Sequence, residues 1–205
     1  FCNAGFDILG TAENKYPSLT GYIGDPTINI AVIFLIIIGG IGFLTWDDIC
    51  TNKWHFKKYR MQSKVILVTT MLLIIAPAVF FFFCDFTGLP LGERILASLF
   101  QSVTPRTAGF NTADLPAMTG SSKAIMILLM LVGGSPGSTA GGMKTTTLAV
   151  LILSAFSVCR KKDDAEVCGR RIDGSAVKNA AAVAVMYFLL FFVGGIVIST
   201  AEGLP

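Results

Sequence analysis

Twelve residues, Gly133-Gly134-Ser135-Pro136-Gly137-Ser138-Thr139-Ala140-Gly141-Gly142-Met143-Lys144, interrupt an otherwise apolar stretch that runs from Ala124 to Val158. In hydrocarbon every backbone N–H and C=O needs a partner. Non-helical backbone at that depth is therefore tolerated only where it is buried in protein or lines a hydrated cavity. The stretch predicts a break at membrane depth beside a water-filled path.

The length of the same region indicates a broken helix. Ser122 to Val158 comprises 37 residues, which as one helix would reach roughly 55 Å, against a hydrocarbon core of about 30 Å. We therefore expect an inner helix over 122–158 that is interrupted in its middle.

Composition assigns the chain to the integral membrane proteins. Hydrophobic residues make up 53% and charged residues 14% of the sequence, and the mean hydropathy is +0.70. Further apolar segments of helical length lie at 28–44, 65–83 and 179–200. The mixed segment 91–104 is too short to cross and predicts a half-membrane pore helix. The expected fold is an all-α integral membrane protein.

Basic residues orient these segments. Five lie between Thr45 and Lys64 and six between Cys159 and Lys178, so both connections are expected on the cytoplasmic side of a multi-pass protein in the cell membrane. The net charge of +3 is then explained by topology and gives no indication of nucleic-acid binding.

The sequence offers no catalytic or transition-metal pattern. Its five cysteines show no C-x-x-C or Cys/His spacing. The single histidine, His55, lies in a basic loop without partners for catalysis. No enzyme activity is expected.

The chain also contains an internal repeat. Cys2-Asn3-Ala4-Gly5-Phe6-Asp7 matches Arg106-Thr107-Ala108-Gly109-Phe110-Asn111, and each copy precedes an apolar segment with a double glycine, Gly39-Gly40 or Gly133-Gly134. Repeated membrane units imply symmetry about a shared path. The predicted unit is an outer helix, a pore helix, an extended Ala-Gly-Phe segment and an inner helix, arranged around a central ion pathway.

These motifs together resemble the pore subunits of the Trk/Ktr/HKT superfamily of potassium and sodium transporters, most of all the Ktr type. The resemblance is carried by the segments 3–7, 101–112 (Gln-Ser-Val-Thr-Pro-Arg-Thr-Ala-Gly-Phe-Asn-Thr) and 133–147. They are similar to the second filter, the third filter and the third-repeat gate of that superfamily.

The resemblance implies that the chain is a fragment of a four-repeat pore. Residues 1–64 would end the second repeat, with its filter, the inner helix 28–44 and a cytoplasmic loop. Residues 65–178 would form the third repeat, with an outer helix 65–83, a pore helix 91–104, a filter 107–111, the broken inner helix 122–158 and a cytoplasmic loop. Residues 179–205 would begin the fourth with its outer helix.

The filter implied by the resemblance binds potassium through backbone carbonyls, which replace water without a fixed charge. We expect 107–111 to be extended, with carbonyls facing an axis shared with Asn3 to Phe6. Potassium is the expected permeant ion, and no cofactor is expected. Arg106 should point away from the filter and pair with Glu93 or with an acid outside this chain. The expected filter residues are Asn3, Ala4, Gly5, Phe6, Thr107, Ala108, Gly109 and Phe110.

The glycine-rich stretch is implied to be a gate that a cytoplasmic partner moves. Lys144 would either extend to the cytoplasm or hold the loop by hydrogen bonds. The implied partners are a ring of nucleotide-binding regulatory subunits, a second pore subunit in a homodimer, and lipid. The expected gate residues are Gly134, Ser135, Pro136, Gly137, Ser138, Thr139, Ala140, Gly141, Gly142 and Lys144.

Three functions stay open from the sequence. Potassium uptake is favoured because Gly5 and Gly109 are both glycine, whereas some superfamily members carry serine at a filter position and select sodium. A sodium-permeable transporter is the first alternative, and a noncatalytic membrane scaffold is the second. Asp7 and Asn111 either contact the ion at the mouth or cap local turns.

Overall fold

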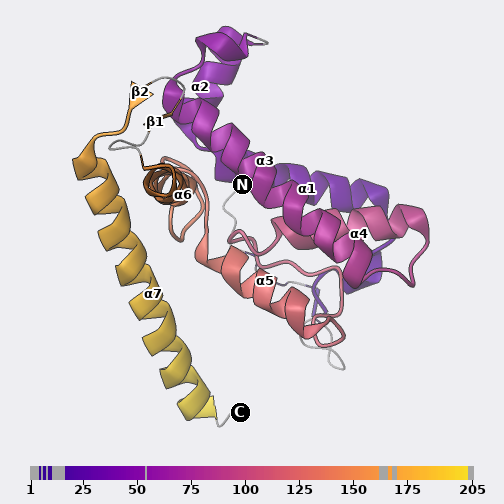
Figure 1. The fold of residues 1–205 in the computed structure, drawn as a ribbon. Coiled ribbons are helices and arrows are strands. Elements are labelled where there is room, and N and C mark those ends of the chain that lie inside the picture. The colour runs from indigo at the N-terminus through magenta and orange to yellow at the C-terminus, as the bar shows by residue number, and fades with distance from the viewer. Residues whose placement is uncertain are drawn as a thin grey trace.

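The computed structural model describes residues 5, 7, 9–10, 17–53, 55–161, 166–167 and 170–202. Within these residues the regular structure is helical apart from one hairpin of two-residue strands (Figure 1). The elements, in chain order, are η1 (Thr20–Tyr22), α1 (Pro26–Ile41), α2 (Phe43–Asn52), η2 (Phe56–Lys58), α3 (Met61–Cys84), α4 (Leu91–Val103), α5 (Gly120–Leu131), α6 (Thr145–Cys159), β1 (Glu166–Val167), β2 (Arg170–Arg171) and α7 (Gly174–Glu202).

Two of the described helices, α3 and α7, are long and apolar enough to cross a membrane by themselves. The pair α1 and α2 meets the same criterion together but is bent by 100° at its junction. The shorter apolar helices α5 and α6 flank the glycine-rich stretch. These helices and the bent pair agree with the predicted all-helical membrane fold, to which the small hairpin is an addition.

The first inner helix differs from the expected range 28–44. It starts earlier, because the Asp25 carboxylate accepts hydrogen bonds from the backbone N–H groups of Thr27 and Ile28, and Pro26 occupies the first turn. It ends at Ile41, because Gly42 adopts φ 93°, outside helical geometry. The chain then turns sharply into α2.

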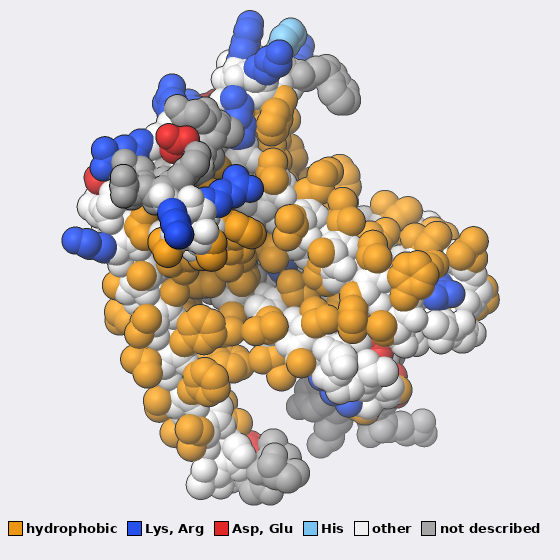
Figure 2. Space-filling model, viewed as in Figure 1, with side chains coloured by type: hydrophobic (Ala, Val, Ile, Leu, Met, Phe, Trp, Pro, Cys, Tyr) orange, Lys and Arg blue, Asp and Glu red, His pale blue; other side chains and the backbone are white. Residues whose placement is uncertain are grey.

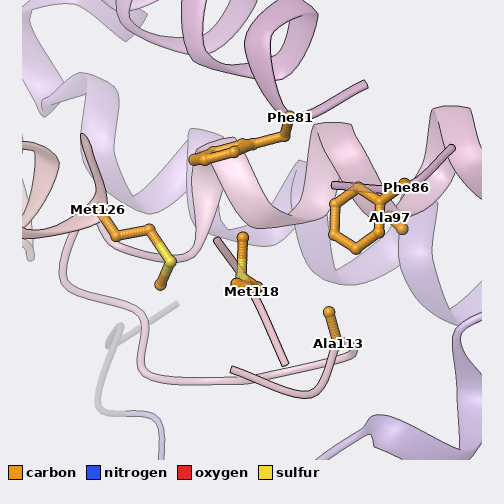
Figure 3. Close-up of a cluster of buried hydrophobic side chains, with 6 residues drawn as sticks. All are labelled: Phe81, Phe86, Ala97, Ala113, Met118 and Met126. Atoms are coloured by element: carbon orange, nitrogen blue, oxygen red, sulfur yellow. The ribbon is translucent and has the colours of Figure 1, made fainter. Parts of the chain in front are cut away.

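The helix α4 packs against both α3 and α1 (Figure 1). Its second half is buried, including Phe100 and Val103. A core cluster joins α3, α4, α5 and the segment that precedes α5. Figure 3 shows Phe81 of α3 above Met118 and Met126, with Phe86 and Ala97 to one side. This packing holds the carboxyl end of α4 in the interior of the molecule.

The helix α7 lies along one side of the molecule and packs mainly on α6 (Figure 1). It begins at Gly174, five residues before the expected 179, because the Asp173 carboxylate accepts hydrogen bonds from the backbone N–H and the hydroxyl of Ser175. Those hydrogen bonds lower the pKa of Asp173. Only Ala180 and Ala184 of α7 are buried, so most of its apolar surface is open to lipid or to further protein.

We expect Phe81→Ala to destabilise the protein by about 3–5 kcal/mol, because the side chain is 0% exposed and its removal leaves a cavity. Phe83→Ala is the matched control on the same helix, since Phe83 is 66% exposed. Thermal unfolding of the purified protein in detergent measures both variants. Equal losses would contradict a core centred on Phe81.

Candidate ion-conduction site

The carboxyl end of α4 leads directly into a tight turn. Backbone N–H groups of Arg106, Thr107 and Ala108 donate to the carbonyls of Val103, Pro105 and Thr104 at 3.2, 2.8 and 3.1 Å. The Thr104 hydroxyl donates to the Phe110 carbonyl. The turn requires left-handed backbone, with φ 64° at Thr107 and 86° at Gly109. The segment 107–111 is therefore not the continuous extended strand that we expected.

This turn leaves carbonyls available. Among the described residues, none donates a hydrogen bond to the carbonyl oxygens of Thr107, Ala108 or Gly109. Gly109 is exposed, while Ala108 is 1% exposed and Phe110 packs on the cluster of Ile36, Val103 and Ala108. Apolar side chains thus anchor the turn, and the carbonyl oxygens of Thr107, Ala108 and Gly109 have no hydrogen-bond donor within the described part of the chain.

The two Ala-Gly-Phe copies meet at their glycines. A β-carbon on Gly5 would lie 2.0 Å from the Ala108 carbonyl oxygen, and one on Gly109 would lie 3.3 Å from the Gly5 Cα. Gly5 also has positive φ, at 62°. Only glycine fits such a backbone contact at position 5. Of the remaining expected filter residues in the first copy, Asn3, Ala4 and Phe6 lie outside the described residues.

Asp7 and Asn111 connect the two copies through Ser18. The Asp7 carboxylate accepts from the N–H groups of Leu9 and Ser18 at 2.9 and 2.7 Å. The Ser18 hydroxyl accepts from the Asn111 N–H at 2.8 Å, and the Asn111 carbonyl accepts from the Leu19 N–H at 2.8 Å. Two roles were considered for Asp7, ion contact and capping of a local turn. Its hydrogen bonds to backbone N–H groups correspond to capping.

Arg106 is buried beside the turn, with 5% of its surface exposed. Among the described residues, its Nε has no hydrogen-bond partner. No ion pair joins Arg106 to Glu93 in the described part of the chain, and the Glu93 carboxyl instead lies close to Gly24. Of the two partners expected for Arg106, Glu93 is wrong, because Glu93 lies in the first turn of α4 and Arg106 lies beyond the end of that helix. Pairing with an acid outside this chain stays a prediction.

The glycine-rich stretch forms a closed loop between α5 and α6. The Gly133 N–H donates to the Met143 carbonyl at 2.9 Å, the Met143 N–H to the Leu131 carbonyl at 3.2 Å, and the Gly134 N–H to the Gly141 carbonyl at 3.3 Å. Val132 and Met143 form a parallel bridge. The two ends of the loop therefore lie side by side and pair with each other.

The tip of this loop is bound to the break between α1 and α2. The Ser135 N–H donates to the Gly40 carbonyl at 2.9 Å, and the Thr139 N–H and hydroxyl donate to the Gly39 carbonyl at 3.2 and 3.1 Å. The Phe43 N–H, at the start of α2, donates to the Gly137 carbonyl at 3.1 Å. The loop thus satisfies backbone groups that a helix end leaves without partners.

Two side chains brace the base of the loop. The hydroxyls of Ser135 and Thr145 are 3.0 Å apart in a buried hydrogen bond. The Lys144 ammonium donates to the Ala140 carbonyl at 2.8 Å. Of the two roles considered for Lys144, this contact corresponds to holding the loop.

A mostly apolar cavity of about 330 Å³ lies where the loop meets the bent pair. It is lined by Ile38, Gly39, Gly42, Phe43, Trp46, Gly137, Ser138 and Thr139. Sequence reasoning identified the double glycine of α1 as a repeat feature but missed Gly42, where a β-carbon would lie 2.5 Å from the Pro136 carbonyl oxygen. The internal repeat does not indicate Gly42, because the corresponding position in the second copy belongs to the glycine-rich loop.

Three features together define a pore-loop membrane transport protein. They are a half-length helix, a glycine turn with available carbonyls, and an inner helix broken by a bound glycine loop. The chain belongs to the TrkH family of cation transport proteins, whose sequence profile matches residues 1–204. This is a family of multi-pass membrane transporters rather than enzymes, as the sequence predicted.

Individual relatives extend over the whole chain. It is 34% identical to the Ktr system potassium uptake protein B of Bacillus subtilis (strain 168) over 211 residues, covering 100% of this chain and 46% of that protein. It is 38% identical to the potassium/sodium uptake protein NtpJ of Enterococcus hirae over 210 residues, covering 100% and 45%. The chain spans about half the length of these curated relatives.

A solved structure has the same fold. The potassium transporter TrkH of Vibrio parahaemolyticus matches with a TM-score of 0.75 at 20% identity, over 97% of this chain and 43% of that one. At this identity the similarity concerns the fold alone. It agrees with the predicted arrangement of helices and pore loops.

We expect Gly133→Ala to disrupt the loop, because the added β-carbon would lie 1.7 Å from the Gly141 carbonyl oxygen. Gly141→Ala is the matched control, since a β-carbon there has no atom within 4 Å. The first variant should lower the thermal unfolding temperature of the purified protein by several degrees, and the control should change it little. The reverse order would contradict the pairing of the loop ends.

Proposed function

We propose that this chain forms part of a potassium uptake pathway across the cell membrane, with a carbonyl filter at Gly5 and Gly109. The observation that carries the proposal is the backbone contact between these two glycines, beside carbonyls that have no donor among the described residues. Membership of a cation transport family supports it. The name of the Bacillus relative, a potassium uptake protein, supports potassium as the ion.

The physical basis is replacement of the hydration shell. A ring of carbonyl dipoles can bind a monovalent cation without the tight hold of a fixed charge, so the ion can also leave. The carboxyl end of α4 adds negative potential at the turn, because helix dipoles sum to a partial negative charge there. Thr107, Ala108, Gly109 and Phe110 would contribute one quarter of the filter, and Asn3, Ala4, Gly5 and Phe6 a second. Potassium would be the permeant ion, and no cofactor would be needed.

The loop 134–142, with Lys144, is proposed as the gate on the cytoplasmic side of the filter. Its binding to Gly39 and Gly40 supports this role, because one loop then joins the inner helices of two repeats. The proposed partners are a ring of cytoplasmic nucleotide-binding subunits, which would move α6 and the loop, and a second pore subunit.

Sodium permeation is the second candidate. It is favoured by the 38% identity to a protein named for potassium and sodium uptake. A noncatalytic scaffold is the third, and it predicts no flux at all. Uptake of each ion by the complete gene product, in a bacterial strain that lacks its own potassium uptake, separates the three.

We expect Gly109→Ser in the complete gene product to reduce the ratio of potassium to sodium uptake about tenfold or more. The side chain strains a backbone at φ 86° and adds a hydroxyl beside the carbonyls. Gly88→Ser is the control, since a β-carbon at Gly88 has no atom within 4 Å. An unchanged ratio at normal expression would contradict Gly109 as a filter residue.

We expect deletion of Pro136, Gly137 and Ser138 to raise basal ion flux several-fold and to weaken its dependence on the cytoplasmic partner. The deletion removes the tip that contacts Gly42 and Phe43 but keeps Gly133 and Lys144. Flux into proteoliposomes, with and without the partner, is the measurement. Gly120→Ala, outside the loop, should keep the flux of the unmodified protein, since a β-carbon there has no atom within 4 Å.

The opposite outcome identifies a passive hinge. A deletion variant that folds, as judged by its unfolding temperature, and still depends fully on the partner would rule out the gate.

A further inference from the structure

A basic pocket lies at the cytoplasmic end of the molecule, where two connections far apart in the sequence meet. It has a volume of about 500 Å³, and its basic lining residues are Lys57, Lys58, Arg60, Lys64 and Arg170. Figure 2 shows Lys and Arg side chains gathered around this end, with hydrophobic side chains directly below them. Both loops contribute to the pocket. Its basic residues are gathered at one place, which the positive charge needed for membrane topology does not by itself require.

Among the described residues, most of this charge has no carboxylate partner. Arg60 pairs with Asp47 at 3.2 Å and with Asp48 at 3.5 Å. In the part of the chain that the structure describes, no carboxylate lies within 4.0 Å of the charged groups of Lys57, Lys58, Lys64 or Arg170. The Lys64 ammonium instead donates to the Lys57 carbonyl at 2.7 Å. The pocket therefore attracts an anion.

An apolar groove continues from the pocket along the membrane-facing side. It has a volume of about 330 Å³ and is lined by Val65, Val68 and Leu72 of α3 and by Ala149, Ile152 and Leu153 of α6. Lys64 lines both the pocket and the groove. Val68, Leu72 and Ile152 are 58%, 60% and 42% exposed, so this groove is open along its length.

The groove has the length of an acyl chain within one leaflet. From Lys64 to Leu72 the helix rises about 12 Å, while half of the hydrocarbon core is about 15 Å thick. A soluble anion would fill the basic pocket but would leave the groove empty. A protein segment could cover the groove only from within the membrane, and the test on the complete gene product includes that case. A ligand with a phosphate head and an apolar tail fits both parts.

We propose that Lys57, Lys58, Lys64 and Arg170 bind the phosphate headgroup of an anionic phospholipid whose acyl chain lies in the groove between α3 and α6. Basic pockets on the cytoplasmic side of membrane helices have the chemistry that recognises anionic headgroups. The long lysine side chains can follow the groove while their ammonium groups reach the headgroup. This site goes beyond the proposed transport function and stands without it.

The test measures lipid binding to the complete gene product in detergent, by native mass spectrometry and by thermal shift. The probes are phosphatidylglycerol, phosphatidylcholine of the same acyl length, and soluble glycerol phosphate. Phosphatidylglycerol should bind at least tenfold more tightly than either other probe. Equal binding of phosphatidylcholine would overturn the basic pocket as the determinant. Equal binding of glycerol phosphate would overturn the proposal that the ligand is a lipid and would identify a site for a free phosphate.

Two pairs of variants test the two parts of the site. Lys57→Gln with Lys64→Gln should weaken phosphatidylglycerol binding about 30-fold, since each basic side chain near a membrane surface contributes about fivefold. Lys161→Gln with Lys178→Gln removes the same charge from the cytoplasmic side outside the pocket and should have little effect. Equal losses of phosphatidylglycerol affinity in the two pairs of variants would show that net charge attracts the lipid and that the pocket does not bind it.

The groove is tested by filling it. Ile152→Trp should weaken phosphatidylglycerol binding about tenfold or more and leave the weak binding of glycerol phosphate unchanged. Val158→Trp, on the same helix outside the groove lining, is the control. All variants must keep the unfolding temperature of the unmodified protein. Unchanged lipid binding by Ile152→Trp would overturn the groove as the acyl-chain site.

Discussion

The need to pair every backbone polar group in apolar surroundings is the constraint on which this structure depends. The stretch from Val132 to Lys144 leaves helical geometry, so its amides and carbonyls cannot be satisfied along one helix axis. The fold meets the need in two ways. The ends of the loop pair with each other, and its tip pairs with the end of α1, where Gly39 and Gly40 present free carbonyls. The loop and the break in α1 therefore require one another.

The same constraint explains where glycine is needed. Gly133 approaches the Gly141 carbonyl, Gly42 approaches the Pro136 carbonyl, and Gly5 approaches the Ala108 carbonyl, each too closely for a β-carbon. In all three cases two backbones touch directly. At the last two contacts, one backbone comes from the first repeat copy and the other from the second. These two contacts between repeats are made by backbone, so they place no requirement on the side chains that each repeat carries around them.

Long apolar helices could be predicted from the sequence, because length and hydropathy determine them. This holds for α3 and α7, and for α4 as a helix too short to cross. The break at Gly42 could not be predicted from the sequence, because the residues on either side are apolar and hydropathy carries no information about the backbone angle φ. The left-handed backbone at Thr107 was equally hidden, since the residue is not a glycine. The repeat did reveal Gly5 and Gly109, because both copies face the same steric requirement.

The hydrogen bonds at the loop tip also set an energy scale for movement. Four of them join the loop to α1 and α2, through the Ser135 and Thr139 amides, the Thr139 hydroxyl and the Phe43 amide. Each is worth about 0.5–1.5 kcal/mol net of water, so their loss costs about 2–6 kcal/mol. Changing a two-state population from 1:99 to 99:1 takes about 5.5 kcal/mol. Under the gate role proposed for the loop, these hydrogen bonds are few enough for a single binding event to release it. Water that entered after release would satisfy the Gly39 and Gly40 carbonyls.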